Sequence, residues 1–192
     1  MKIGLLGGTF DPPHLGHLIM ADEALYQCGL DEVWFLPSFE PPHAERKTSS
    51  HPIAAEHRLE MVQRAIQDDR RFKLSTIEYE RRGKSYTYET IEELNEKFPE
   101  HQFYFIIGAD MVNDLPKWVR FDEIKKRITF IGFNRADVDF HPPRDVKMLK
   151  AEMPDIGISS SLVRRRIHDK GAWHYFVPEA VKNYIEVNGL YE

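Results

Sequence analysis

The chain has 192 residues, of which 42% are apolar and 30% charged, a balance typical of a folded globular protein. Its net charge of −5 is opposite in sign to that of proteins that coat nucleic acid, so we expect no nucleic-acid partner. No apolar run approaches the roughly 18 residues needed to cross a bilayer, which argues against a membrane-spanning protein.

Short apolar runs typical of buried strands alternate with segments whose apolar residues recur at helical spacing. The predicted strands are 2–6, 32–37, 72–80, 102–108 and 128–133, and the predicted helices are 15–28, 55–66 and 88–98. Strands that are apolar throughout indicate a parallel sheet whose two faces are both covered. We therefore predict an α/β fold with a doubly wound, Rossmann-like parallel sheet and helices on both faces.

The last third of the chain is expected to end in a helical segment. Residues 134–154 carry charges and two prolines without a clear period, which predicts a surface excursion, and a short strand is expected at 156–158. The serines at 159–161 are expected to cap a helix that runs through Ile167. A final helix is predicted from Pro178 to the Asn188-Gly189 stop signal. Residues 1–192 are expected to form one domain.

The first strand-to-helix junction, IGLLGGTFDPPHLGH, is the main chemical signal in the sequence. Gly7 and Gly8 would let a ligand approach the backbone closely and can adopt positive φ. The helix start that follows attracts phosphate. His14 and His17 lie one turn apart on it and can both donate hydrogen bonds to phosphate oxygens. Two imidazoles also suit a metal ion, but no third ligand is nearby in the sequence, so we predict no protein metal site.

Two common phosphate motifs are absent. The dinucleotide fingerprint G-x-G-x-x-G does not follow the first strand. The RRGKS segment is similar to the end of a Walker A loop, but Glu78 stands where that motif requires its first glycine. The single cysteine, Cys28, lies on an apolar helix face and excludes an intramolecular disulfide, which is consistent with a cytoplasmic location.

Together these motifs resemble those of a known family. GGTFDPPHLGH resembles the H-x-G-H signature of the nucleotidyltransferases, and ISSSLVR at 158–164 resembles the I-S-S-T-x-x-R element of the same superfamily. KSYTYET at 84–90, GADM at 108–111, LPKW at 115–118 and the C-terminal PEAVKNYIEVNGLYE are similar to segments of the bacterial nicotinate-nucleotide adenylyltransferases. The resemblance covers essentially the whole chain.

The resemblance implies transfer of the adenylyl group of ATP to nicotinate mononucleotide, a step of NAD biosynthesis, with Mg²⁺ accompanying the ATP. It assigns catalysis to His14, His17 and Arg164. The residues implied in binding ATP are Gly7, Gly8, Thr9, Phe10, Gly108, Asp110, Ile158, Ser159 and Ser160. Those implied in binding nicotinate mononucleotide are Lys47, Tyr86, Thr87, Asp110 and Trp118, with Trp118 facing the pyridine ring and the amides at 86–87 holding the carboxylate.

One departure from the family pattern concerns the loop after the second strand. Relatives often carry lysine directly after PPH, whereas this chain has Ala44, and Lys47 or Arg46 could replace it. The role of 134–154 stays unassigned.

The resemblance leaves several alternatives open. A sister enzyme could use nicotinamide mononucleotide or phosphopantetheine, a non-enzymatic ATP sensor could use the same fold, and a synthetase-like fragment could share the H-x-G-H motif. The sequence does not decide whether the chain forms a homo-oligomer.

Overall fold

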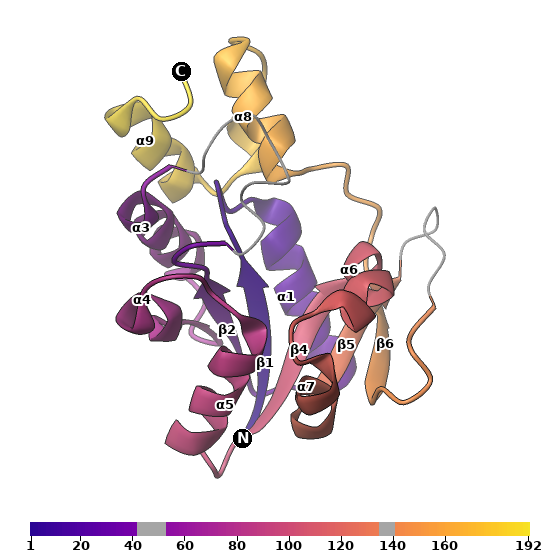
Figure 1. Cartoon of the computed structure of the whole chain (residues 1–192). Helices are drawn as coiled ribbons and strands as arrows, with labels where there is room; N and C mark the ends of the chain where they lie inside the picture. The colour runs from indigo at the N-terminus through magenta and orange to yellow at the C-terminus, as the bar shows by residue number, and fades with distance from the viewer. Residues whose placement is uncertain (42–52, 135–140) are drawn as a thin grey trace.

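The computed structural model describes residues 1–41, 53–134 and 141–192. One parallel sheet has the strand order β3-β2-β1-β4-β5-β6 (Figure 1). Its strands are β1 (Lys2–Gly8), β2 (Glu32–Pro37), β3 (Phe72–Leu74), β4 (Gln102–Gly108), β5 (Thr129–Asn134) and β6 (Met148–Glu152). The chain winds outward first on one side of β1 and then on the other. The predicted α/β doubly wound fold is confirmed, and its topological switch point lies between the carboxyl ends of β1 and β4.

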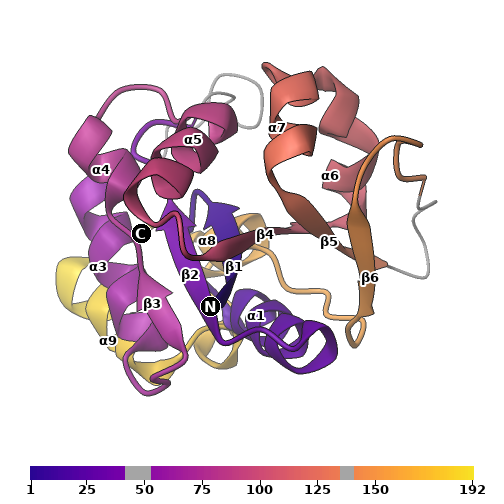
Figure 2. The ribbon, with the colours of Figure 1, turned by 90° about the horizontal axis from the view of Figure 1, so that it is seen from below.

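Helices cover both faces of the sheet, as Figure 2 shows. The helices α1 (Leu15–Cys28) and α3 (Ala55–Ile66) pack on one face, and α5 (Thr87–Lys97), α6 (Ala109–Asp114) and α7 (Phe121–Arg127) pack on the other. Side chains alternate along β1, so that Leu5 belongs to one core and Leu6 to the other. Covered faces explain why the central strands are apolar at nearly every position.

The C-terminal segment forms a third apolar cluster at the carboxyl end of the sheet. It contains α8 (Ser160–His168), the short 3₁₀ turn η2 (His174–Phe176) and α9 (Glu179–Asn188). Val163 and Val181 pack there against Met61 of α3. The predicted end of the last helix is confirmed, because Gly189 caps it in the left-handed conformation (φ 58°).

Three details of the predicted elements are wrong. The strand expected over 72–80 ends at Leu74, and α4 (Ile77–Arg81) follows it. Apolar residues at 77 and 79 alternate as in a strand, but the hydroxyl of Thr76 donates to Glu80 Oε1 (2.7 Å) across one helical turn. No strand occurs at 156–158.

The third correction concerns the predicted surface excursion at 134–154, which contains β6. This edge strand pairs only with β5 and buries only Ala151, so it carries little apolar signal. Among the described residues, no helix is long and apolar enough to cross a membrane.

Candidate active site

The loop between β1 and α1 brings two histidines together at the carboxyl edge of the sheet. The backbone N–H of His14 donates to Nδ1 of His17 (3.1 Å), and the two ring centroids are 3.8 Å apart. An Nδ1 that accepts a hydrogen bond carries no proton, so the neutral His17 ring has its proton on Nε2. His17 therefore has one hydrogen-bond donor in a fixed position, its Nε2–H.

Both imidazoles are held in their neutral form. Burial lowers the pKa of His14, whose side chain is only 8% exposed, to about 4. Burial and the neighbouring His14 lower the pKa of His17 well below its usual value of 6.5. At neutral pH these rings supply hydrogen bonds rather than positive charge.

The glycine between the histidines makes room for this pair. A Cβ at Gly16 would lie 3.0 Å from two ring atoms of His14, which is closer than side chains normally tolerate. The expectation of positive φ at Gly7 and Gly8 is wrong, because both residues continue β1. Phe10 instead adopts positive φ (50°), and its ring contacts the ring of His17 edge-on, with centroids 4.9 Å apart.

Distant segments hold the residues that follow β1. Arg58 of α3, only 2% exposed, donates to the carbonyl of Thr9 (2.9 Å). It also donates to the carbonyls of Ser38 (2.6 Å) and Phe39 (2.7 Å), which follow β2. Its Nε donates to the carbonyl of Ile53 (3.3 Å). The sequence gives no sign of this role for Arg58, because a charged residue within an amphipathic helix normally faces solvent.

Helix α8 contributes several predicted residues to the same loop. Ser160 Oγ donates to the carbonyl of Pro12 (2.8 Å), and Arg164 Nη1 donates to the carbonyl of Asp11 (2.7 Å). The side chain of Ser159 caps α8 by accepting from the Leu162 amide (3.2 Å), and Ile158 packs against the third apolar cluster. The structure thus brings Arg164 and the start of α8 to the loop that carries His14 and His17.

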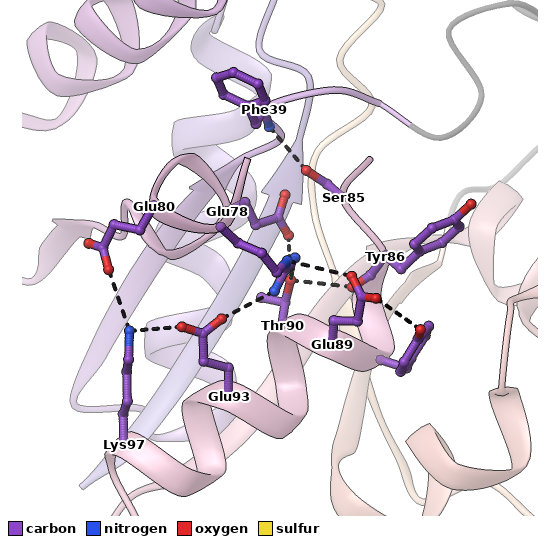
Figure 3. A network of polar contacts seen from close by, with 11 residues as sticks. Phe39, Glu78, Glu80, Ser85, Tyr86, Glu89, Thr90, Glu93 and Lys97 are labelled. Carbon is purple, nitrogen blue, oxygen red and sulfur yellow. Dashed lines mark hydrogen bonds and ion pairs between the residues drawn. The ribbon is translucent and has the colours of Figure 1, made fainter. Parts of the chain in front are cut away.

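A second cluster lies where the segment after β2 meets the start of α5 (Figure 3). The Phe39 amide donates to Ser85 Oγ (3.1 Å), and Arg81 Nη2 donates to Thr90 Oγ1 (2.9 Å). Each of the two hydroxyls accepts one of these hydrogen bonds and can still donate its own proton. Thr90 Oγ1 donates to the buried Glu78 carboxylate (2.8 Å), and the hydroxyl of Ser85 is hydrogen-bonded to it as well. Burial raises the pKa of Glu78, while these hydroxyl hydrogen bonds oppose that shift.

This network fixes the first turn of α5. Tyr86 is the N-cap residue in an extended conformation, and its side chain makes no capping hydrogen bond to the amides of the turn that begins at Thr87. Amides at a helix start are suited to a carboxylate. Arg81 links the network to the outer face of α5 through Glu89 (3.5 Å) and Glu93 (3.3 Å).

The remaining predicted residues follow β4. Gly108 is the N-cap of α6, where an added Cβ would meet no other described atom within 4 Å, and Asp110 is exposed. The partly buried Trp118 packs edge-on against Phe105 of β4, with centroids 5.7 Å apart. Lys47 and Arg46 lie outside the described residues. Within the described ranges, no group of three or more His, Cys, Asp or Glu side chains could hold a metal ion.

Comparisons with known proteins identify the family of the chain. Residues 5–166 match the model of the cytidylyltransferase-like family. The chain is 47% identical over 191 residues to the nicotinate-nucleotide adenylyltransferase of Bacillus subtilis (strain 168), covering 100% of this chain and 98% of the relative.

Two solved structures share the fold. One is the Plasmodium falciparum nicotinic acid mononucleotide adenylyltransferase complexed with NaAD (TM-score 0.80, 20% identity, 99% of this chain and 97% of that one). The other is the same enzyme complexed with APC (TM-score 0.79, 21% identity, 99% and 96%).

Proposed function

The chain belongs to the cytidylyltransferase-like family and, within it, to the nicotinate-nucleotide adenylyltransferases, and on this premise we propose how its residues perform the reaction. The enzyme transfers the adenylyl group of ATP to nicotinate mononucleotide, giving nicotinate adenine dinucleotide and pyrophosphate. A phosphate oxygen of the mononucleotide forms the new bond to the α-phosphorus, and the bond from that phosphorus to the pyrophosphate oxygen breaks.

The observation that carries the mechanism is the pair of neutral imidazoles, of which His14 is buried and His17 is partly buried. A phosphate monoester is already a nucleophile near neutral pH, so the enzyme needs to supply position and charge stabilisation rather than a general base. The Nε2–H of His17 is a fixed donor for an oxygen of the transferring phosphoryl group. His14 and the guanidinium of Arg164 complete the set of catalytic contacts that we propose.

The ATP lies, on this proposal, over the switch point between β1 and β4. Backbone groups of Gly7, Gly8, Thr9 and Phe10 approach its phosphates, and the start of α8 with Ile158, Ser159 and Ser160 closes over it. Gly108 and Asp110 bind the nucleoside portion, with the Asp110 carboxylate accepting from ribose hydroxyls. The open space next to Gly108 supports this placement.

Nicotinate mononucleotide lies on the neighbouring side, next to the start of α5 and the segment after β2 that hydrogen-bonds to it. The uncapped amides at Tyr86 and Thr87 bind its carboxylate, and Trp118 contacts the pyridine ring. An amide substituent would bring N–H groups toward these donors, which favours the acid over the amide. Lys47 is the proposed cation from the loop outside the described residues.

Mg²⁺ is the proposed metal, arriving with the triphosphate. Magnesium commonly binds substrate phosphates and waters and takes only one or two protein carboxylates. It would neutralise charge on the phosphates, while the residues above orient the reacting groups. We further propose that residues 1–192 work as one catalytic domain, because α8 and α9 are packed against α3 and the β1–α1 loop.

The test is a turnover assay with ATP and Mg²⁺ that offers nicotinate mononucleotide, nicotinamide mononucleotide and phosphopantetheine in parallel, with products identified by mass. We expect strong preference for the nicotinate substrate. Equal use of the amide would keep the enzyme class and overturn the carboxylate argument. Binding of ATP without any product would point to a sensor instead.

A further inference from the structure

The end of the chain returns to the β1–α1 loop. After α9 the backbone turns through Gly189 and then through Tyr191, which has positive φ (70°). The hydroxyl of Tyr191 donates to Oδ1 of Asp11 (2.7 Å), a contact between residues 180 positions apart. Figure 1 shows the C-terminus at the same end of the sheet as α8. The penultimate residue therefore touches the loop that carries the catalytic histidines.

Asp11 stands between Tyr191 and Arg164. The side chain of Asp11 is only 8% exposed. While Oδ1 accepts from Tyr191, Oδ2 lies 3.8 Å from Arg164 Nη1, which is too long for a hydrogen bond. The same Nη1 atom donates instead to the main-chain carbonyl of Asp11 (2.7 Å), and Nη2 donates to Ser161 Oγ (3.3 Å).

The alternative arrangement is close in space. A nearly buried carboxylate that loses its hydrogen bond incurs a desolvation cost and turns to the strongest donor within reach. For Asp11 that donor is the guanidinium of Arg164, which needs to move only about an ångström to form a charge-assisted hydrogen bond. Such a pair would direct the arginine toward a protein carboxylate rather than toward a phosphate.

We propose that Tyr191 is a positioning residue for the transfer reaction: its hydroxyl satisfies Asp11 and so leaves Arg164 available to the phosphates of ATP. The inference rests on the proposed role of Arg164 and adds a residue from the C-terminus to the site. It also gives Asp11 a role: its carboxylate binds Tyr191, and only its main-chain carbonyl accepts a hydrogen bond from Arg164.

The main test is Tyr191→Phe, which keeps the ring and removes only the donor. ATP affinity measured by titration calorimetry should fall about tenfold, the scale of one lost charge-linked contact, while KM for nicotinate mononucleotide stays within about twofold. Tyr184→Phe is the matched control. Its hydroxyl also joins the C-terminal segment to α3, 2.8 Å from His57 Nδ1, but does not touch the loop. We expect Tyr184→Phe to leave ATP affinity unchanged.

Two double variants separate positioning from general stability. Asp11→Asn in the Tyr191→Phe background removes the charge that would capture Arg164, and should restore most of the ATP affinity. In an Arg164→Ala background, Tyr191→Phe should cost less than about twofold, because the two changes act on one contact. Unfolding midpoints in urea identify any variant with a damaged fold.

Three results would overturn the inference: ATP affinity of Tyr191→Phe within twofold of the unmodified protein, an equal tenfold loss in the Arg164→Ala background, or no rescue by Asp11→Asn. Failure of the proposed function is distinguishable. If Arg164→Ala alone binds ATP normally, the role assigned to Arg164 is wrong whatever Tyr191 does.

Discussion

On the proposed function, the loop after β1 and the start of α5 bind different anionic groups of the substrates and differ in how they are held in place. The β1–α1 loop and the first turn of α1 carry two neutral imidazoles, His14 buried and His17 partly buried, and the loop's main-chain carbonyls accept hydrogen bonds from α3 and α8. At the start of α5 the side chain of Tyr86 makes no capping hydrogen bond, and the hydroxyls of Ser85 and Thr90 bind the buried Glu78 carboxylate. The β1–α1 loop is held by several hydrogen bonds to its backbone, whereas the start of α5 is held by hydrogen bonds to one buried carboxylate.

The proposed function accounts for this difference through the task that it gives to each region. Transfer of a phosphoryl group gains most from donors that are rigid before the substrate arrives. The choice between a carboxylate and an amide depends on keeping donor groups at the correct place and angle. We therefore expect substitutions in the first region to lower kcat, and those in the second to raise KM for the mononucleotide.

The largest effect is expected for His17→Ala. Loss of one fixed donor to a transition-state phosphate costs roughly 3–4 kcal/mol, so kcat should fall about 10²–10³-fold while KM for the mononucleotide changes little. Steady-state kinetics measures both. The control is His174→Ala, an exposed histidine 3.3 Å from Glu186 and distant in sequence from the loop. A fall in kcat of less than about threefold would refute the role of His17.

Burial of the neutral His14 ring should make the free energy of unfolding depend on pH. The folded pKa of His14 is about 4, below its unfolded value of 6.5, so the unfolded chain binds more protons between these pH values. The free energy of unfolding should therefore decrease as the pH falls through this window, by about 2 kcal/mol at pH 5 from His14 alone.

Urea unfolding at pH 7 and pH 5 measures this loss. The control is His14→Asn, which keeps a residue well suited to the helix N-cap. This variant should lose about 2 kcal/mol less between the two pH values than the unmodified protein. An identical pH dependence in both proteins would mean that His14 is not buried as a neutral ring.

Glu78→Gln should have a smaller effect, confined to the second region. A glutamine offers one acceptor and an NH₂ group, so Ser85 and Thr90 cannot both keep their present contacts. KM for nicotinate mononucleotide should rise about tenfold, and the preference for acid over amide should fall, with KM for ATP unchanged. Glu80→Gln is the matched control, because Glu80 lies on the exposed side of α4. Equal effects of both substitutions on KM would contradict the proposed role.

The smallest effect is expected for Trp118→Phe. The shorter ring keeps an apolar contact with Phe105 but offers less area to a pyridine, so KM for the mononucleotide should rise about threefold. Trp34→Phe is the control, since Trp34 is also partly buried and packs edge-on against Phe103 (5.8 Å). If KM for the mononucleotide rises no more for Trp118→Phe than for Trp34→Phe, Trp118 contributes to core packing and does not contact the substrate.

Local sequence patterns predicted the central strands and the longer helices that pack on them. Continuous apolar runs marked β1, β2, β4 and β5, and the helical spacing of apolar residues marked α1, α3 and α5. The edge strand β6 was missed because a strand with one neighbour and mostly exposed side chains has little apolar signal. For α4, alternation at Ile77 and Tyr79 indicated a strand, whereas the packing of Ile77 and Glu78 favours a helix.

The candidate site was predictable only where its residues form a contiguous motif. His14 and His17 share one helix turn, and Ser159 and Ser160 start another, so their neighbourhood is visible in the sequence. Arg58 reaches the site from α3, and its contact with Thr9 spans 49 positions. Nothing local distinguishes such a side chain from an ordinary surface charge until the fold brings the segments together.

Arg58 has a consequence for how the site can vary. It contacts Thr9, Ser38 and Phe39 through carbonyl oxygens, which every amino acid possesses, so the side chains at those positions can change without disturbing its hydrogen bonds. Position 58 has no such freedom, because lysine presents its donors from a single nitrogen and cannot reproduce the planar spread of a guanidinium. The side chains at these three positions can therefore change, while the geometry that their backbones share depends on Arg58.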